Sequence, residues 1–398
     1  MTFKEVQLQD ILDIQWGDTK TTKASYVSDG YLAYSATGPD GFLEKFDYDR
    51  EGIVLSAIGA NCGSTFFASG KWSCIKNTIR ILPKSGAIDL KYFFYMTKAP
   101  DFWPIRGSAQ PFISQTDIRE LYVQIPEISV QNAIGKILFE LEQKISTNNA
   151  LSKTLEDIAQ TIFKSWFIDF DPVKAKMAGE KPTGMDAATA ALFPDSMEGS
   201  ELGSVPKGWK VSNLDYLSFT RYGAPFASKL FNTTKVGLPL IRIRDLKKQS
   251  ISTWSPENHT KGFLVSGGEL LVGMDGEFNP TIWFGEDALV NQRICKIEPK
   301  EFVSNFFLYF TLLPIMRRIE HSSTGSTVIH LGKTDIDAIR VSEPPQKILA
   351  EYKSMVEPML RNMVSLNIQT RILQEARDAL LPRLISGELQ IPEEMLAS

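Results

Sequence analysis

The sequence predicts an α+β fold made of two related halves, each a globular mixed α/β domain followed by one long helix. Three features predict this fold: an ordered internal repeat, two long stretches with apolar residues every three or four positions, and a polar segment between the halves. A chain of 398 residues has room for two or three compact domains, each able to bury its own core.

The internal repeat relates residues 52–84 to residues 268–300. The identities at one constant offset are Gly52/Gly268, Leu55/Leu271, Thr65/Thr281, Ile81/Ile297, Pro83/Pro299 and Lys84/Lys300. Further along, the run Thr116-Asp117-Ile118 matches Thr334-Asp335-Ile336 after the offset has drifted by only two residues. A match this long and ordered indicates an internal duplication with a pseudo-twofold relation between the halves.

Each repeat combines short strands with one aromatic helical stretch. Apolar runs bounded by Gly and Pro predict strands at 53–55 and 78–82, and at 270–272 and 293–297 in the second half. The stretches 91–96 and 304–310 are rich in Phe and Tyr, and we expect them to be helices that contribute to the cores.

A long helical pattern follows each globular part, over residues 131–170 and 346–398. Its apolar residues recur with the 3.5-residue period of a coiled coil for about four heptads. About 40 helical residues span roughly 60 Å, which is longer than a domain needs for its own core. Asn148 interrupts the first seam, and two interpretations stay open: it fixes the register, or it is a tolerated polar interruption.

The linker between the halves covers residues 171–205 and is rich in Gly, Pro, Ala, Asp and Glu. We expect it to run over the surface without a core of its own. The globular parts are then residues 1–130 and 206–345.

Composition narrows the class of protein. The net charge of −4 excludes a generally basic nucleic-acid coat but allows a local basic face. Cys62, Cys74 and Cys295 form no CxxC pair, which suits a reducing cytoplasm. No apolar signal core and no run of 18 apolar residues is present, so we expect a cytoplasmic protein without membrane association.

The sequence contains little that points to catalysis. Its three His residues show no metal-ligand spacing, and we predict neither a metal site nor catalytic residues. The segment from Gly63 to Lys71 has the wrong spacing for a phosphate loop, and no dinucleotide-binding or nucleophile-elbow motif appears. Asn279-Pro280 lacks the second proline and the aromatic residue of an amino-methyltransferase tetrapeptide. The chain is therefore predicted to be a binding protein.

Three sequence segments resemble those of a known protein family. They are WFIDFDPVKAKM at 166–177, ELGSVPKGW at 201–209 and LLPRLISGEL at 380–389. Over essentially its whole length the chain resembles type I restriction–modification specificity subunits, although no counterpart of the second segment precedes Val6. The resemblance implies two target-recognition domains, with the two long helices lying against each other as an antiparallel coiled coil.

The resemblance also implies the function and the partners. Each globular domain is expected to read one half of a bipartite, asymmetric target in double-stranded DNA, while the helices set the half-site spacing. Two copies of an adenine-N6 DNA methyltransferase subunit are expected to dock on the helices, and a restriction subunit to join them. No cofactor is expected in this chain; S-adenosylmethionine, ATP and Mg²⁺ are expected in the partner subunits.

Two regions are candidates for DNA contact. The first is a pair of small polar loops just before the repeated Thr-Asp-Ile, and solvent turns are the alternative interpretation. The second is an expected strand at 240–248 that places two arginines on one face, and a soluble strand edge is its alternative. The candidate residues are Arg106, Gly107, Ser108, Gln110, Arg242, Arg244, Ser323, Thr324, Ser326 and Thr327.

The ends of both long helices carry more large apolar side chains than a two-helix seam needs. Such residues are typical anchors in protein interfaces, and the resemblance points to methyltransferase docking. The alternative is packing against the linker and a globular part of the same chain. The candidates are Phe163, Trp166, Phe167, Phe170, Leu381 and Leu384.

A second function class is a scaffold that organises partner subunits without reading DNA. The salt dependence of DNA binding distinguishes a DNA reader from such a scaffold, because a reader that contacts several phosphates loses affinity steeply as the salt concentration rises.

Overall fold

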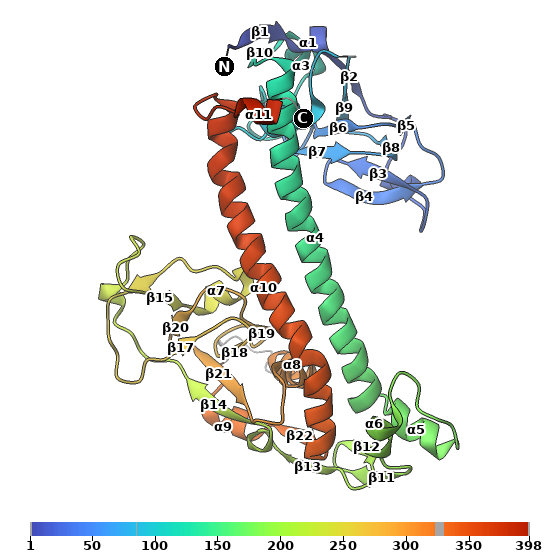
Figure 1. The fold of residues 1–398 in the computed structure, drawn as a ribbon, viewed down its shortest axis with the longest axis vertical. Coiled ribbons are helices and arrows are strands. Elements are labelled where there is room, and N and C mark those ends of the chain that lie inside the picture. The colour runs from blue at the N-terminus through green and yellow to red at the C-terminus, as the bar shows by residue number, and fades with distance from the viewer. Residues whose placement is uncertain (1, 85, 323–329, 397–398) are drawn as a thin grey trace. The chain divides into compact units, whose positions relative to one another are not determined.

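The computed structural model describes residues 2–84, 86–322 and 330–396, and it divides into two compact units (Figure 1). Unit 1 comprises Met1–Ile145 and Ile372–Ser398, and unit 2 comprises Ser146–Arg371. Each unit therefore contains a globular part and a portion of both long helices. This division differs from the boundaries expected from the sequence, because each helix belongs partly to each unit.

Unit 1 is built on two four-stranded sheets and one short strand pair. The first sheet is antiparallel, in the order β2 (Leu12–Trp16), β9 (Thr78–Pro83), β6 (Gly52–Ser56), β7 (Thr65–Ala68). The second has the order β4 (Gly38–Leu43), β3 (Tyr31–Ser35), β8 (Lys71–Cys74), β5 (Tyr48–Asp49), with β3 and β8 parallel. β1 (Lys4–Gln7) pairs with β10 (Tyr122–Ile125). The helices are α1 (Leu8–Ile11), η1 (Lys23–Ser25), α2 (Leu90–Met96), α3 (Gln115–Glu120) and α11 (Glu393–Leu396).

Unit 2 repeats this topology. Its first sheet has the order β14 (Ser218–Tyr222), β21 (Ile294–Pro299), β18 (Leu270–Gly273), β19 (Pro280–Ile282). Its second has the order β16 (Trp254–Ser255), β15 (Leu238–Ile241), β20 (Ala288–Val290), β17 (Leu264–Val265), with β15 and β20 parallel. β13 (Lys210–Asn213) pairs with β22 (Arg340–Glu343). The helices are η2 (Leu214–Tyr216), η3 (Ser228–Leu230), α7 (Ile243–Lys248), α8 (Asn305–Ser322) and α9 (Lys333–Asp337).

The matching strand orders confirm the predicted duplication, since β2 to β9 of unit 1 correspond one by one to β14 to β21 of unit 2. The central strands show why the repeat keeps apolar residues at these positions. In β6, Ile53 and Leu55 pack into one apolar cluster while Val54 packs into another. Leu271 of β18 likewise faces a different cluster from its two neighbours. Both faces of this strand are therefore covered, which requires a continuous apolar run.

The four strands predicted within the repeat and the two aromatic helices are also confirmed. In α2, the Asp89 carboxylate accepts a hydrogen bond from the Tyr92 N–H at 2.7 Å and caps the helix. Near the start of α8, the Ser304 hydroxyl accepts one from the Phe307 N–H at 3.0 Å. Most rings on these helices are buried, and Phe94 and Tyr309 are partly buried against the same cores.

The two long helices are α4 (Ile128–Phe167) and α10 (Gln346–Ile385), 40 residues each. In unit 1 the first part of α4 lies beside the last part of α10, where Arg377 pairs with Glu142 at 2.6 Å. In unit 2 the last part of α4 lies beside the first part of α10, where the Tyr352 hydroxyl donates to the Ala159 carbonyl at 3.1 Å. These contacts confirm an antiparallel pair.

The linker is more structured than the sequence suggests. It forms α5 (Asp171–Met177), α6 (Ala187–Ala191) and a hairpin of β11 (Met197–Ser200) with β12 (Gly203–Pro206). Val173, Phe193 and Val205 are buried in the main core of unit 2. The expectation of a purely surface segment is therefore wrong, because these three side chains share the core of the adjacent domain. Among the described residues, no helix is long and apolar enough to cross a membrane.

Candidate DNA interface

In unit 1 the loop predicted to contact DNA is a closed turn fixed by backbone hydrogen bonds. Arg106 and Phe112 exchange two N–H···O=C bonds of 2.8 Å each across the turn. Gly107 has φ of 79°, and a side chain there would meet the Gln110 carbonyl at 2.8 Å, so this position favours glycine. The turn is tied to the β6–β7 loop through Gly59 N–H to Pro111 O at 2.9 Å.

The candidate residues of this turn lie together on the surface. Arg106 is 61% exposed, and its guanidinium pairs at 2.7 Å with Asp117, the central residue of the repeated Thr-Asp-Ile. Gly107, Ser108 and Gln110 are exposed as well. The structure thus brings the loop candidates of unit 1 to one place.

Sequence reasoning missed two aromatic residues at the same place. A hollow of about 470 Å³ lies beside the turn, lined by Trp16, Ile58, Gln110, Phe112, Ser114, Gln115 and Thr116. Trp16 is 38% exposed and Phe112 41% exposed, although both are large apolar side chains. Phe112 is the last residue of the loop 106–112 that the sequence marked as a candidate for DNA contact, whereas no sequence feature singled out Trp16.

Unit 2 has the same backbone frame, in which the residues before the repeated Thr-Asp-Ile pair with the loop that follows the central strand, but it carries different side chains there. The Leu331 N–H donates to the Met274 carbonyl at 2.9 Å. The backbones of Asp275 and His330 form an isolated antiparallel β-bridge, as those of Ile58 and Phe112 do in unit 1. The Asp275 carboxylate contacts His330 Nδ1 at 2.5 Å and Arg293 Nε at 3.1 Å. The candidates Ser323, Thr324, Ser326 and Thr327 lie outside the described residues.

The expectation of a strand bearing Arg242 and Arg244 is wrong. β15 ends at Ile241 and α7 begins at Ile243, so the two arginines do not share a strand face. The reason is a helix start: the Arg242 N–H donates to the Asp245 carboxylate at 2.9 Å. Arg242 lies over the Phe231 ring at 5.7 Å, while Arg244 is exposed.

Arg244 nevertheless lies near the frame of unit 2. It lines a cavity of about 570 Å³ together with Lys247, Asp275 and Asn279. The helix α7 has no counterpart between β3 and β4, so this cavity is built from a feature that unit 1 lacks.

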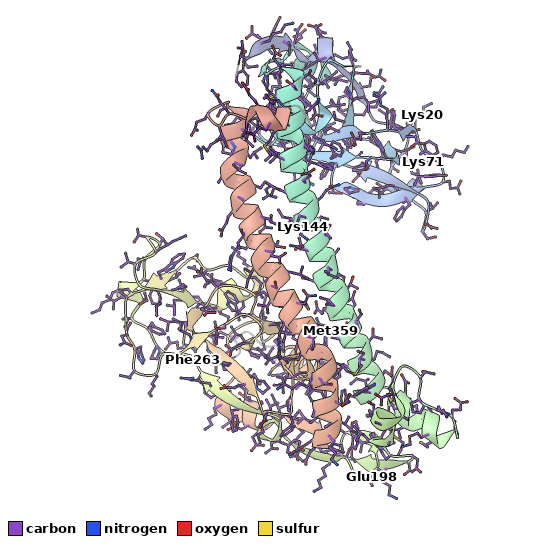
Figure 2. All side chains as sticks on the ribbon, in the orientation of Figure 1. Lys20, Lys71, Lys144, Glu198, Phe263 and Met359 are labelled. Carbon is purple, nitrogen blue, oxygen red and sulfur yellow. The ribbon has the colours of Figure 1, made fainter. Side chains whose placement is uncertain are left out.

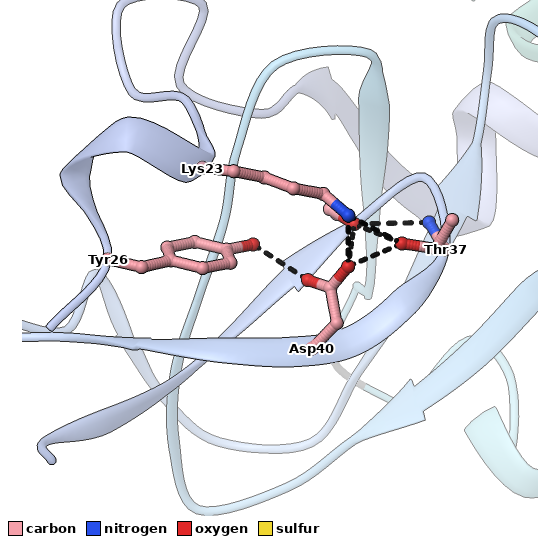
Figure 3. A network of polar contacts seen from close by, with 5 residues as sticks. Lys23, Tyr26, Thr37 and Asp40 are labelled. Atoms are coloured by element: carbon pink, nitrogen blue, oxygen red, sulfur yellow. Dashed lines mark hydrogen bonds and ion pairs between the residues drawn. The ribbon is translucent and has the colours of Figure 1, made fainter. Parts of the chain in front are cut away.

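Where unit 2 has α7, unit 1 has a tight β3–β4 hairpin with a network of polar side chains. Figure 3 shows Lys23, Tyr26 and Thr37 converging on the Asp40 carboxylate of the β3–β4 hairpin. Lys23 lies at 2.5 Å, the Tyr26 hydroxyl at 2.8 Å and the Ser35 hydroxyl at 2.7 Å. Burial alone would raise the pKa of Asp40, but these hydrogen bonds outweigh it and hold that pKa well below its ordinary value.

Exposed cations are present on the same unit. Figure 2 shows Lys20 and Lys71 on the side of the unit 1 sheets that faces away from α4. Both are exposed, and Lys71 Nζ lies 4.9 Å from the centre of the Phe46 ring. Cations placed locally in this way are compatible with the net negative charge of the whole chain.

Most of the docking candidates lie in cores. Phe163, Trp166 and Phe167 are 5%, 4% and 7% exposed and pack in the core of unit 2, against rings such as Phe193 and Tyr352. These three side chains are therefore not surface anchors. Their burial agrees with the alternative interpretation, in which they pack against the linker and a globular part of the same chain. The remaining three pack less uniformly: Phe170 is partly buried in unit 2, and Leu381 is partly buried and Leu384 buried in unit 1.

Other helix residues present apolar surface. Leu151 and Ile158 lie seven residues apart on α4 and are each 41% exposed. A spacing of seven places two residues on the same face of a helix. The sequence pattern did not distinguish these two residues from the buried seam.

The described residues contain no group of three or more His, Cys, Asp or Glu side chains that could hold a metal ion. Burial raises the pKa of Cys74 to about 11 and that of Cys295 to about 12, so both thiols are protonated near neutral pH. Neither cysteine is a reactive nucleophile.

Comparison with known proteins agrees with this architecture. Residues 1–157 and 206–358 match the family model described as the type I restriction modification DNA specificity domain. The chain belongs to the type I restriction–modification specificity family. This family is non-catalytic. Its two matched segments correspond to the two halves of the duplication.

Relatives and a solved structure share this family frame. The chain is 23% identical over 373 residues to the MjaIX specificity subunit of Methanocaldococcus jannaschii, covering 86% of this chain and 79% of that protein. It is 35% identical over 191 residues to the EcoBI specificity subunit of Escherichia coli, covering 47% and 40%. The fold resembles a type I restriction–modification S subunit from M. genitalium with a TM-score of 0.68, at 15% identity and 96% coverage of both chains.

Proposed function

We propose that each unit reads one half of a bipartite, asymmetric DNA target. One observation carries this proposal: the two units present different side chains on the same frame. Phe112 of unit 1 occupies the place that His330 occupies in unit 2, where it is paired with Asp275. A duplicated protein with identical reading surfaces would favour a symmetric target, whereas diverged surfaces favour two different half-sites.

Under this proposal the long helices set the distance between the half-sites. An α-helix of 40 residues is about 60 Å long, whereas one turn of DNA rises about 34 Å. Lengthening or shortening a helix pair by whole turns is expected to change the spacer and leave the bases read in each half unchanged.

The helices also recruit the enzymatic partners in this proposal. Two copies of an adenine-N6 DNA methyltransferase subunit, and a restriction subunit in the complete system, supply S-adenosylmethionine, ATP and Mg²⁺ chemistry. The exposed pair Leu151 and Ile158 supports a docking face on α4, because exposed apolar residues at helical spacing fit the apolar face of another helix. Replacing both by Ser is expected to weaken methyltransferase recruitment. Replacing the exposed polar pair Ser146 and Lys153 by Ala, at the same spacing on α4, is the control and is expected to leave recruitment unchanged.

The deciding experiment is a map of N6-methyladenine in cells that carry this chain together with its methyltransferase, compared with cells that carry the methyltransferase alone. A split, asymmetric motif that depends on this chain supports the proposal. Exchange of residues 1–127 with those of a relative, with α4 left whole, is expected to change one half-site only. A change in both halves contradicts independent reading.

A scaffold without DNA reading gives a different result. It produces no new methylation even though the chain and the methyltransferase are expressed and associated. DNA binding by the purified complex separates the same two functions, because a reader making several phosphate contacts loses affinity steeply with salt.

A further inference from the structure

We propose that the hollow between Trp16, Gln110 and Phe112 reads one A·T base pair within the half-site of unit 1. Gln110 is assigned to the adenine, and the two aromatic rings to the methyl group of the paired thymine. This inference rests on the proposed half-site reading and adds the identity of one base pair and the residues that recognise it.

The positions of these residues are fixed by the backbone. Phe112 is held in two bridges, one to Arg106 within the turn and one to Ile58 on the β6–β7 loop. Trp16 is the last residue of β2 and pairs with Ile79 of the neighbouring β9. Side chains on backbone that is fixed by such pairings need little reordering to meet a base edge, which favours specific contact.

The chemistry of the hollow matches one base pair. In the major groove only adenine places an acceptor, N7, next to a donor, the N6 amino group, and a glutamine amide complements both. Gln115, the other amide lining the hollow, already donates to the Ile14 carbonyl at 2.7 Å. Among the described residues that line the hollow, Gln110 is therefore the exposed side-chain amide that makes no intramolecular hydrogen bond.

The aromatic rings account for the thymine. Thymine alone carries a C5 methyl group in the major groove, and apolar side chains recognise it by contact. Trp16 and Phe112 expose 38% and 41% of their surface at the edge of the hollow, beside Ser114 and Thr116. Covering this apolar surface with a methyl group removes it from water, which favours thymine over uracil or cytosine at this position.

The described residues at the matching place in unit 2 form a different combination. There His330 stands where Phe112 stands, and Asp275 engages both His330 and Arg293. Among the described residues at this place, a polar, hydrogen-bonded pair thus replaces the exposed ring of Phe112. The proposed reading of thymine is therefore confined to the half-site of unit 1.

The test uses the full chain in complex with its methyltransferase, after the methylation map has given both half-sites. Each thymine of the target is replaced in turn by deoxyuridine, which lacks only the methyl group, and the dissociation constant is measured. At one position in the unit 1 half-site we expect a loss of roughly fourfold, the effect of one buried methyl group. Replacing the paired adenine by 7-deaza-adenine, which lacks the N7 acceptor, is expected to cost about fivefold.

Variants connect these losses to the residues. Phe112→Ala is expected to bind the thymine and deoxyuridine targets equally, and Trp16→Ala, on a different strand, to reduce the same difference. Gln110→Ala is expected to abolish the effect of 7-deaza-adenine. Phe42→Ala is the matched control, since Phe42 is an aromatic residue of unit 1 with 38% exposure that does not line the hollow.

The outcomes separate this inference from the function on which it rests. If no split motif forms, the proposed half-site reading fails. If a split motif forms but no deoxyuridine substitution in the unit 1 half-site weakens binding, only the present inference is overturned. It is equally overturned if Phe112→Ala and Trp16→Ala both keep the full thymine preference, while binding to the other half-site shows that the variants are folded.

Discussion

Asn148 on α4 is a buried seam residue whose side-chain N–H donors are unpaired among the described residues. The side chain is 1% exposed, and its Nδ2 has no hydrogen-bond partner among the described residues. A buried donor left without an acceptor costs about 1–3 kcal/mol relative to its hydrated state. Leucine branches at Cγ as asparagine does and carries no polar atom. We therefore expect Asn148→Leu to raise the free energy of unfolding of unit 2 by about 1–3 kcal/mol.

Urea unfolding of the full chain, followed by far-ultraviolet circular dichroism, measures this change. Asn149→Leu is the matched control, because the next residue is exposed and its replacement is expected to change the free energy by less than about 0.5 kcal/mol. A decrease for Asn148→Leu would refute the reasoning, since it would mean that the amide is satisfied in the folded chain.

The same variant decides between the two interpretations of this seam position. If Asn148 fixes the register of the helix pair, the stabilised variant is expected to methylate targets with more than one spacer length. If it is a tolerated interruption, the spacer stays single. The methylation map of cells carrying the variant distinguishes these results.

Three other predictions follow from burial and charge. Trp166→Ala removes a ring that is 4% exposed and whose centre lies 5.2 Å from the centre of the Phe193 ring. Its loss is expected to lower the free energy of unfolding in urea titration by about 3–5 kcal/mol, while methyltransferase recruitment per folded molecule stays unchanged. Loss of recruitment by folded protein would instead restore the assignment of Trp166 as a docking residue. Because the folded-state pKa of Asp40 is lowered, its carboxylate stabilises the fold above its unfolded pKa of about 4, and this contribution is lost as the pH falls toward the folded-state pKa. Asp40→Asn is expected to flatten that part of the stability–pH profile, and an unchanged profile would contradict the role of the network. Glu142→Gln weakens the ion pair that Glu142 makes with Arg377 at 2.6 Å. It is expected to lower the free energy of unfolding by up to about 1 kcal/mol, and by less at high salt. A decrease that does not depend on salt would show that packing, and not charge, matters at this position.

The duplication gives one chain two diverged surfaces on a common fold. The sheets and their apolar clusters repeat between the units, whereas the elements between β3 and β4 and between β15 and β16 differ. A tight hairpin with the Asp40 network stands in unit 1, and α7 stands in unit 2. Core residues are constrained by packing, while loops and inserted elements tolerate change, so specificity can diverge without loss of the fold.

The sequence by itself determined the periodic and repeated features. The internal repeat, the strands around Ile53 and Leu271, the aromatic helices and the two long helices follow from local spacing, which depends only on residues near in sequence. The Thr-Asp-Ile repeat also located the turn before Asp117. The family followed from the segments near the helix ends, because these are long and ordered.

Only the tertiary structure decided which apolar residues are covered and which loops meet. Trp166 and Leu151 both fit a helical apolar pattern, yet the first is buried in unit 2 and the second is exposed. Trp16 and Phe112 lie far apart in sequence, and only pairing of β2 with β9 and of the turn with Ile58 brings them to one hollow. Burial and long-range pairing depend on the whole chain, so spacing along the sequence does not determine them.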